Sequence, residues 1–246
     1  MIIYGKNPVL EFINNSPDIV EKVYILGGGT NRENALIIEA VNRIDIPLLK
    51  RSKQQLNDIC KTSKHQGVVA KIKDFEYADL KYLLKTKKDK NKIIVILDHL
   101  EDPQNFGAIL RSCSFFAVDG VVIPRNRAVS VTPAVIKVSA GGASSVPVTK
   151  VTNLSATIKK LKDSGYWIVG TDAGSGDDLR SLNVNGLDIA VIVGNESNGI
   201  SEKLKAHCDY LVGIVGYGEV SSLNVSVATG IIIYELSEAK SGINLN

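Results

Sequence analysis

The chain has 246 residues, of which 44% are apolar and 22% charged, with 29 Lys and Arg against 26 Asp and Glu. This balance is typical of a folded protein and excludes intrinsic disorder and fibrous repeats. No apolar run approaches the roughly 18 residues that cross a bilayer, and the opening residues lack the apolar stretch of a signal peptide. We therefore expect a cytoplasmic protein without a membrane partner.

Short strand-like and helix-like segments alternate through residues 1–73. Strands are expected at 22–26, 46–49 and 68–72, and helices at 31–43 and 52–60. Ser52, followed three residues later by Gln55, has the pattern of a capping box at the start of the second helix. This alternation predicts a small α/β domain, here called the front module.

Residues 74–92 are rich in lysine and lose the apolar pattern after Leu84, so we place a basic linker there. Residues 1–92 hold 17 Lys and Arg against 11 Asp and Glu, a net charge of +6, whereas the remainder carries a net charge of −3. Such asymmetry is one hint of a module that binds nucleic acid. Lysines that only solvate a linker helix would produce it as well.

Residues 93–246 form the predicted C-terminal domain. Its six apolar, β-rich runs lie at 93–97, 120–123, 146–148, 166–169, 189–193 and 210–214. Nearly continuous hydrophobicity, with helix-length segments between most runs, predicts a mostly parallel sheet that is covered on both faces. The last segment, 224–239, is apolar on most sides, which indicates a buried or interface helix.

Neither nucleotide loops nor metal motifs are present. Gly174-Ser175-Gly176 follows a strand, but the third glycine position holds Leu179, and there is no G-x-x-x-x-G-K-S/T. The cysteines Cys60, Cys113 and Cys208 are far apart and form no C-x-x-C pair, so neither a disulfide framework nor a metal is expected.

Polar residues and glycines gather just past three predicted strands, where open α/β sheets build their sites. These segments are 98–111, 193–201 and 216–226. Each has a structural explanation as well: Asp102 or Asn105, Ser201, and one of Ser221, Ser222 or Asn224 would cap the helix that follows. If a helix begins near Asn105, Arg111 lies about 240° around it, so the two share a face only if Asn105 is at the helix entrance.

The ordered set N-F-G-A-I-L-R (105–111), V-G-N-E-S-N-G-I (193–200) and S-S-L-N-V-S-V-A-T-G (221–230) resembles the three motifs of the SpoU, or TrmH, family of RNA ribose 2'-O-methyltransferases. The resemblance extends over essentially the whole chain. Tyr4-Gly5-Lys6-Asn7-Pro8-Val9 and the basic residues behind it resemble the small L30e-like substrate-binding domain of bacterial members. The layout is most similar to enzymes that methylate a guanosine of large-subunit (23S) ribosomal RNA.

The resemblance implies a SPOUT domain, a parallel sheet whose C-terminal segment is tied in a deep trefoil knot that binds S-adenosylmethionine. By position, the residues implied to hold the cofactor through their backbones are Gly194, Ile214 and Leu223. The residues that match the active site of the family are Asn105, Arg111, Glu196, Ser222 and Asn224. The family also implies a homodimer with the active site near the interface.

One position departs from the family pattern. Members commonly show Ile-Pro-Met in the cofactor loop, and this chain has Ile214-Val215-Gly216. Loss of the proline predicts a looser loop and weaker cofactor binding, because the loop must be ordered when the cofactor binds.

The implied role of Arg111 in accepting the ribose proton is chemically demanding, since a guanidinium is effectively always protonated. Either RNA phosphate and a dry pocket perturb Arg111 enough to accept the proton, or it stays charged and stabilises phosphate and developing alkoxide. We expect Asn105 and Glu196 to orient Arg111 and the ribose, and Ser222 with Asn224 to shape the cofactor and substrate loop.

RNA phosphates are expected to contact the front module first. The candidate contacts are Lys6, Arg32, Lys50, Arg51, Lys53 and Lys64, with Arg125 and Arg127 in the C-terminal domain. A transfer-RNA methyltransferase of the same family and a non-catalytic, ribosome-associated RNA-binding protein are the competing interpretations.

Overall fold

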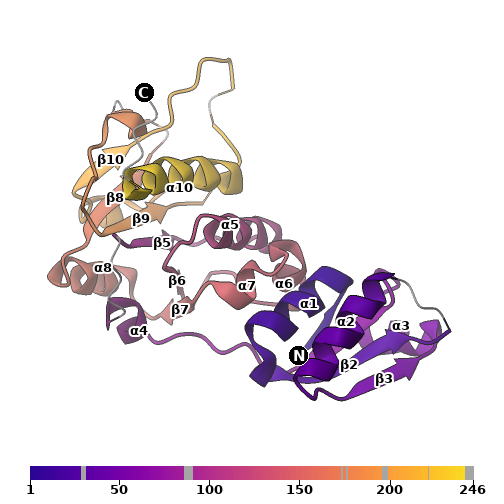
Figure 1. The fold of residues 1–246 in the computed structure, drawn as a ribbon. Coiled ribbons are helices and arrows are strands. Elements are labelled where there is room, and N and C mark those ends of the chain that lie inside the picture. Colours follow the sequence, from indigo (N-terminus) through magenta and orange to yellow (C-terminus); the bar gives the residue numbers. More distant parts are fainter. Residues whose placement is uncertain are drawn as a thin grey trace.

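The computed structural model describes residues 1–28, 32–85, 91–172, 174–175, 177–195, 199–220 and 222–241. Two sheets organise it, one in each half of the chain (Figure 1). Among the described residues no helix is long and apolar enough to cross a membrane.

The front module is built on a four-stranded sheet in the order β1-β4-β2-β3, in which β4 runs antiparallel to β1 and β2. Its elements are β1 (Ile2–Tyr4), α1 (Lys6–Asn15), a 3-10 turn (Pro17–Ile19), β2 (Val20–Leu26), α2 (Arg32–Arg43), β3 (Leu48–Arg51), α3 (Lys53–Cys60) and β4 (Val68–Ile72). The capping box at Ser52 is confirmed, since Ser52 Oγ accepts from Gln55 N and Gln55 Oε1 accepts from Ser52 N.

The C-terminal half contains a parallel six-stranded sheet in the order β10-β8-β9-β5-β6-β7, which confirms the predicted fold class. The strands are β5 (Ile93–Leu97), β6 (Gly120–Pro124), β7 (Val148–Val151), β8 (Trp167–Thr171), β9 (Ile189–Val193) and β10 (Tyr210–Val212). The helical elements are α4 (Leu80–Lys85), α5 (Pro103–Phe115), α6 (Pro133–Ser139), α7 (Gly142–Ser145), α8 (Leu154–Asp163), a 3-10 turn (Leu179–Ser181), α9 (Glu202–Lys205) and α10 (Val225–Ser241). The trefoil knot stays a prediction.

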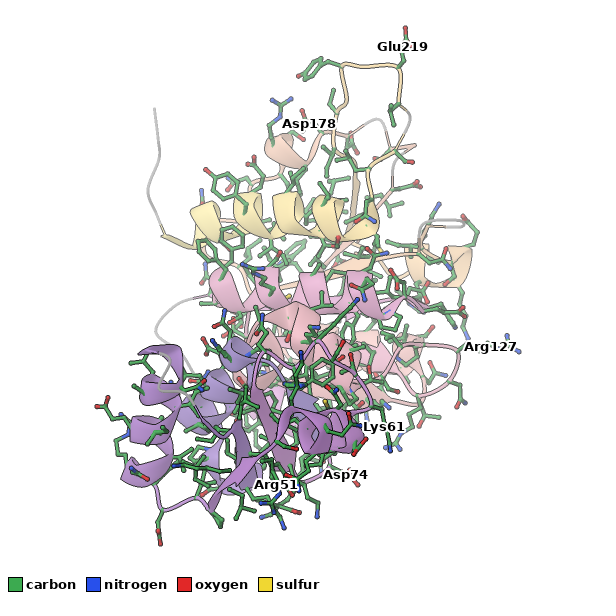
Figure 2. The ribbon with its side chains drawn as sticks, turned by 90° about the vertical axis from the view of Figure 1, so that its right-hand side faces the viewer. Arg51, Lys61, Asp74, Arg127, Asp178 and Glu219 are labelled. Atoms are coloured by element: carbon green, nitrogen blue, oxygen red, sulfur yellow. The ribbon has the colours of Figure 1, made fainter. Side chains whose placement is uncertain are left out.

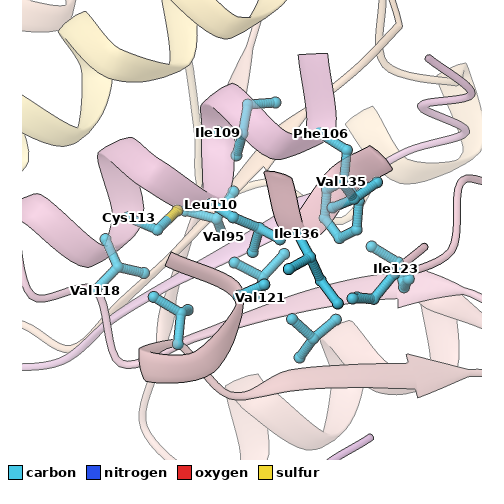
Figure 3. Close-up of a cluster of buried hydrophobic side chains, with 14 of the residues drawn as sticks. Val95, Phe106, Ile109, Leu110, Cys113, Val118, Val121, Ile123, Val135 and Ile136 are labelled. Carbon is cyan, nitrogen blue, oxygen red and sulfur yellow. The ribbon is translucent and has the colours of Figure 1, made fainter. Parts of the chain in front are cut away.

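Successive residues of a strand point to opposite faces of the sheet. Every residue of β5, β6 and β9 is buried, so both faces of this sheet are covered. Val95 and its alternating neighbours pack under α5 and α6, where Phe106, Leu110 and Ile136 are fully buried (Figure 3). Ile94 and its alternating neighbours pack against α4, α8 and α9.

Helices α5 and α10 lie side by side and run in the same direction (Figure 1). Asn105 contacts Asn224 at their N-terminal ends, and the rings of Phe116 and Tyr234 lie 5.9 Å apart toward the other end. Between these two contacts, Gly230 faces Ser112: a Cβ built at Gly230 would be 3.6 Å from Ser112 Oγ. One face of α5 is therefore dedicated to the last helix.

The first part of the predicted linker is bound to the C-terminal half. Ala78 N donates to Val148 O of the edge strand β7 at 2.8 Å. Tyr77 Oη accepts from Val131 N at 2.9 Å, and Lys150 Nζ lies 4.3 Å from the centre of the Tyr77 ring. Residues 86–90 of that linker lie outside the described part.

Two predicted strands begin later than expected, each just after a proline. The run at 46–49 becomes β3, which starts at Leu48 after Pro47, and the run at 146–148 becomes β7, which starts at Val148 after Pro147. A proline has no N–H to contribute to a ladder, so the strand begins beyond it. The elements β1 and α1 were not predicted. Pro8 in the first turn of α1 obscures its pattern, although a proline is tolerated there.

Candidate active site

Helix α5 fixes the first motif after the central strand β5. Asp102 is its N-cap, and its carboxylate accepts from Gln104 N at 3.0 Å and from Asn105 N at 3.2 Å. Asn105 is thereby the third residue of the helix and is buried, with 9% of its surface exposed. Of the two residues predicted as the N-cap of this helix, Asp102 and Asn105, the structure shows that Asp102 is the cap.

Asn224 joins the third motif to the first. Its Nδ2 donates to Asn105 Oδ1 at 3.0 Å, and its Oδ1 accepts from Ser226 N at 2.9 Å and from Ser226 Oγ at 2.6 Å. Asn224 therefore caps α10 and fixes Asn105 with the same amide. Asn105 and Asn224 are 119 positions apart in the sequence and are hydrogen-bonded to each other. Both are among the residues that match the active site of the family in the sequence analysis.

Arg111 lies on a different side of α5 from Asn105. Asn105 is already within the helix, so the 100° turn per residue places Arg111 about 240° away from it. The Arg111 side chain is exposed, and no hydrogen bond or ion pair with the described part of the chain holds it. These positions argue against the hypothesis that Asn105 orients Arg111 within one protomer.

The exposed side of α5 also carries Phe115, one turn beyond Arg111, with 82% of its surface exposed. On α10, Val227 is 52% exposed and Tyr234 is 43% exposed. A buried or interface helix was predicted from the sequence at 224–239, whereas the exposed side of α5 at Phe115 was not predicted.

Gly194 directly follows strand β9 and lies in a very narrow space. A Cβ at position 194 would lie 1.9 Å from the carbonyl carbon of Gly199, so only glycine permits the chain to pass there. Gly199 N also donates to Asn195 O at 3.0 Å, which closes the turn of the second motif. Glu196 lies outside the described residues, and its predicted role stays a prediction.

The segment after β10 forms an open loop with exposed apolar side chains. Ile214 is partly buried against the core, whereas Leu223 is 48% exposed and Val220 is 81% exposed. A Cβ at Gly216 or at Gly218 would have nothing within 4 Å. Ser222, predicted to shape this loop, is exposed. Free space beside apolar side chains fits a partly apolar ligand such as S-adenosylmethionine.

A second loop supports this one. Arg180 Nη2 donates to Tyr217 Oη at 3.2 Å and pairs with Asp178 Oδ2 at 2.6 Å. The hydrogen bond from Arg180 lowers the pKa of the Asp178 carboxyl. Figure 2 shows Glu219 at the tip of the loop that follows β10, with Asp178 below it in this view.

Five of the predicted RNA contacts lie toward one end of the front sheet, spread from its one edge strand to the other. Arg51 ends β3 opposite Leu26, the end of β2, and the register also places Tyr4, at the end of β1, opposite Val69 near the start of β4. The cationic residues in or near these strand ends are Lys6, Lys50, Arg51, Lys53 and Lys64. The side chain of Arg32 is not among those described. Arg125 and Arg127 are exposed at the carboxyl end of β6 in the other sheet.

Comparison with known proteins decides the family. Residues 92–234 match the SpoU rRNA Methylase family, and residues 2–78 match a family described as RNA 2'-O ribose methyltransferase substrate binding. The chain belongs to the SpoU rRNA methylase family. It is 36% identical over 236 residues to YacO of Bacillus subtilis (strain 168), assigned to the TrmH family of tRNA/rRNA methyltransferases, with 95% of this chain and 94% of that protein covered.

Two similar solved structures differ in how much of the chain they cover. The AdoMet-bound rRNA methyltransferase of Sinorhizobium meliloti covers 99% of this chain and 88% of its own, with a TM-score of 0.78 and 18% identity, which shows a shared fold. The TrmH/SpoU tRNA modifying enzyme of A. aeolicus covers only 66% of this chain and 81% of its own, with a TM-score of 0.56 and 28% identity.

Proposed function

We propose that this SpoU-family protein transfers a methyl group from S-adenosylmethionine to the ribose 2'-hydroxyl of a guanosine in large-subunit ribosomal RNA. The observation that carries the proposal is the hydrogen bond between Asn105 and Asn224, because it joins the first and third motifs of an RNA methyltransferase family close in sequence to the open loop at 215–220.

S-adenosylmethionine would be held by the backbones of Gly194, Ile214 and Leu223. The second motif folds back on itself so that Gly194 lies against the backbone of Gly199, and the exposed Leu223 offers an apolar surface. The bound cofactor supplies an activated methyl group on a sulfonium. Positioning of the attacking oxygen then dominates the rate, since correct alignment of two reactants is worth several kcal/mol, on the order of 7–11 in the best cases.

The protein must also deal with the proton of the ribose hydroxyl. Arg111 is proposed for this, either as the acceptor or as a charged group that stabilises the developing alkoxide. Glu196, Ser222 and Asn224 complete the proposed site, and Asn105 is fixed by Asn224.

In a homodimer, Arg111 could contribute to an active site at the interface between the two copies. Phe115 and Arg111 share the exposed side of α5, and Val227 and Tyr234 extend the exposed apolar surface on α10. If a second copy covers this surface, Arg111 is placed at the interface, close to the partner rather than to Asn105 of its own chain. Burial of these side chains would supply the apolar contact that a stable dimer needs.

Ribosomal RNA is favoured over transfer RNA by the front module. The A. aeolicus tRNA modifying enzyme covers 66% of this chain, whereas the S. meliloti rRNA methyltransferase covers 99%. The cluster at one end of the front sheet, with Arg32, Arg125 and Arg127, would contact phosphates and give a salt-dependent affinity.

The substitution Arg111→Ala tests the reaction. We expect methyl transfer to unmodified bacterial ribosomal RNA to fall about 100-fold or more, in the range typical of a lost acid–base or electrostatic group. Calorimetric binding of S-adenosylmethionine should stay near that of the wild type. Near-normal turnover in Arg111→Ala would contradict both roles proposed for this side chain.

A further inference from the structure

A hollow opens at the carboxyl ends of β5, β6 and β7, and its lining does not include Asn105, Asn224 or the loop after β10. Its volume is about 240 Å³. Its lining includes Asp98, His99, Arg127, Ser201 and Lys203. Ligand pockets usually measure ~300–1,000 Å³, so this hollow is too small for a dinucleotide and suits one nucleotide unit.

Asp98 and His99 form a fixed pair in this hollow. Asp98 is 2% exposed, its Oδ2 accepts from Ser201 N at 2.9 Å, and its Oδ1 is bonded to His99 Nδ1. A carboxylate only accepts, so the proton of the neutral ring is on Nδ1 and Nε2 remains an acceptor. Nearly half of the His99 side chain is exposed, at 46%. His99 has a φ of +58°, a backbone conformation that L residues seldom adopt.

Two cations stand at the rim of the same hollow. Arg127 and Lys203 are exposed, and within the described part of the chain neither forms an ion pair. Arg127 also has a left-handed backbone, with a φ of +52°, and its side chain extends away from the ribbon into solvent (Figure 2). The Asp98 carboxylate is fully engaged below them, so the rim offers positive charge to a polyanion.

The hollow is connected to the methyltransferase motifs by backbone hydrogen bonds. Asp98 N donates to Val193 O at 2.8 Å, one residue before Gly194. Ser201, whose N donates to Asp98, directly follows the second motif. An acceptor inside and two cations at the rim match the hydroxyl or base edge and the phosphates of one nucleotide.

We propose that this hollow binds a nucleotide of the RNA that flanks the methylated one. His99 Nε2 accepts a hydrogen bond from its ribose hydroxyl or base, and Arg127 and Lys203 contact its phosphates. The inference rests on the proposed function and adds substrate-positioning residues, Asp98 and His99, that the family motifs do not include.

The test compares His99→Asn, His99→Gln and the double variant Arg127→Asn/Lys203→Gln with the wild type. Asparagine tolerates the left-handed backbone and can still reach Asp98, but it lacks the acceptor at the Nε2 position, which glutamine partly restores. Lys160→Gln, an exposed lysine on α8 away from the hollow, is the charge control. Thermal unfolding verifies that each variant is folded.

Each variant is assayed for binding and methylation of transcribed, unmodified 23S RNA at several salt concentrations. We expect His99→Asn to raise KM for RNA about three- to tenfold with kcat unchanged, as for one lost hydrogen bond, and His99→Gln to recover part of the loss. The double variant should lower the slope of log K against log salt by roughly 1.4–1.8, for two lost phosphate contacts.

The proposal is overturned if folded His99→Asn and the double variant both behave like Lys160→Gln while the wild type binds and methylates RNA. A wild-type protein that binds S-adenosylmethionine but neither binds nor methylates any RNA would instead overturn the proposed function itself.

Discussion

At the scale of single residues, Asn224 combines two roles that can be separated by substitution. Its Oδ1 caps α10 through Ser226 N, and its Nδ2 donates to Asn105. An aspartate in its place would still cap the helix but would have no hydrogen to donate. The geometry of the proposed active site would then be lost while the helix stays capped.

We predict that Asn224→Asp keeps the free energy of unfolding near that of the wild type but lowers methyl transfer about tenfold or more, since two oxygens would face each other. Asn224→Ala should lose activity and also ~0.5–2 kcal/mol of stability, the usual value of a lost cap. Thr132→Ala is the control: it removes the N-cap of α6, so it should lower stability by a similar amount while methyl transfer stays near that of the wild type. Full activity in folded Asn224→Asp would contradict the role of the contact with Asn105.

His65 gives the front module a pH-dependent stability. Its Nδ1 accepts from Gly67 N at 2.9 Å, so the ring proton is on Nε2, which donates to Asn57 Oδ1 at 3.0 Å. Burial, with a smaller contribution from the charge of Lys53, lowers the pKa of His65 from its ordinary value of 6.5. The unfolded chain therefore binds the proton more readily than the folded chain.

Stability from His65 should be complete above pH ~6.5 and should decline as the pH falls below that value toward the lowered pKa of the folded state. Urea unfolding of the wild type and His65→Gln at pH 7.5 and pH 5.0 measures the effect. The advantage of the wild type should shrink at the lower pH. An advantage that is equal at both pH values would show that protonation of His65 is not involved.

At the scale of elements, the turn between β9 and α9 depends on Gly194. In Gly194→Ala, the new methyl group would overlap the backbone of Gly199, so the turn must move. We predict loss of S-adenosylmethionine binding and a destabilisation of about 1–3 kcal/mol or more.

Gly27→Ala, in the front module, is the matched control, because its Cβ would make only ordinary contacts, 3.8 Å from Arg51 O and from Lys50 Cβ, and its backbone is not left-handed. It should fold and bind S-adenosylmethionine nearly as the wild type does. If calorimetry gave the two variants equal affinity, the proposed cofactor site at Gly194 would be wrong.

The sequence predicted the parallel sheet well because β5, β6 and β9 are continuous apolar runs, which a sheet covered on both faces requires. It did not predict α1, where local polarity and Pro8 weaken the helical pattern. It also did not predict which side of α5 faces α10, because that depends on tertiary contacts such as Ser112 with Gly230. Asp98 and His99 were included in the first polar segment, 98–111, but their side-chain pairing was not predicted, because it depends on the left-handed backbone at His99.

At the scale of the whole molecule, the front module is packed against the C-terminal half. Gly141, with a φ of +99°, lies so close to Glu11 of α1 that a Cβ would be 2.6 Å from Glu11 Cγ. Lys137 Nζ lies 4.8 Å from the centre of the Tyr4 ring, and Ser16 Oγ donates to Ser144 O at 3.4 Å. These contacts hold α1 and β1 of the front module against α6 and α7 of the C-terminal half.

Gly141→Ala should disturb this contact and weaken RNA binding while S-adenosylmethionine binding is preserved. Gly186→Ala is the control, because Gly186 has a similar left-handed backbone with nothing within 4 Å of its Cβ. Filter binding and calorimetry on both variants measure the two affinities. Equal RNA affinity in the two folded variants would argue against a role for the packing between the two halves.

The most direct measurement of the central claim is methyl transfer from labelled S-adenosylmethionine to unmodified ribosomal RNA and transfer RNA in parallel, followed by nucleoside analysis. The account predicts label in 2'-O-methylguanosine of the large ribosomal RNA and none in transfer RNA. Label in transfer RNA alone would contradict the proposed substrate, and absence of transfer to both by the folded protein would contradict the proposed reaction.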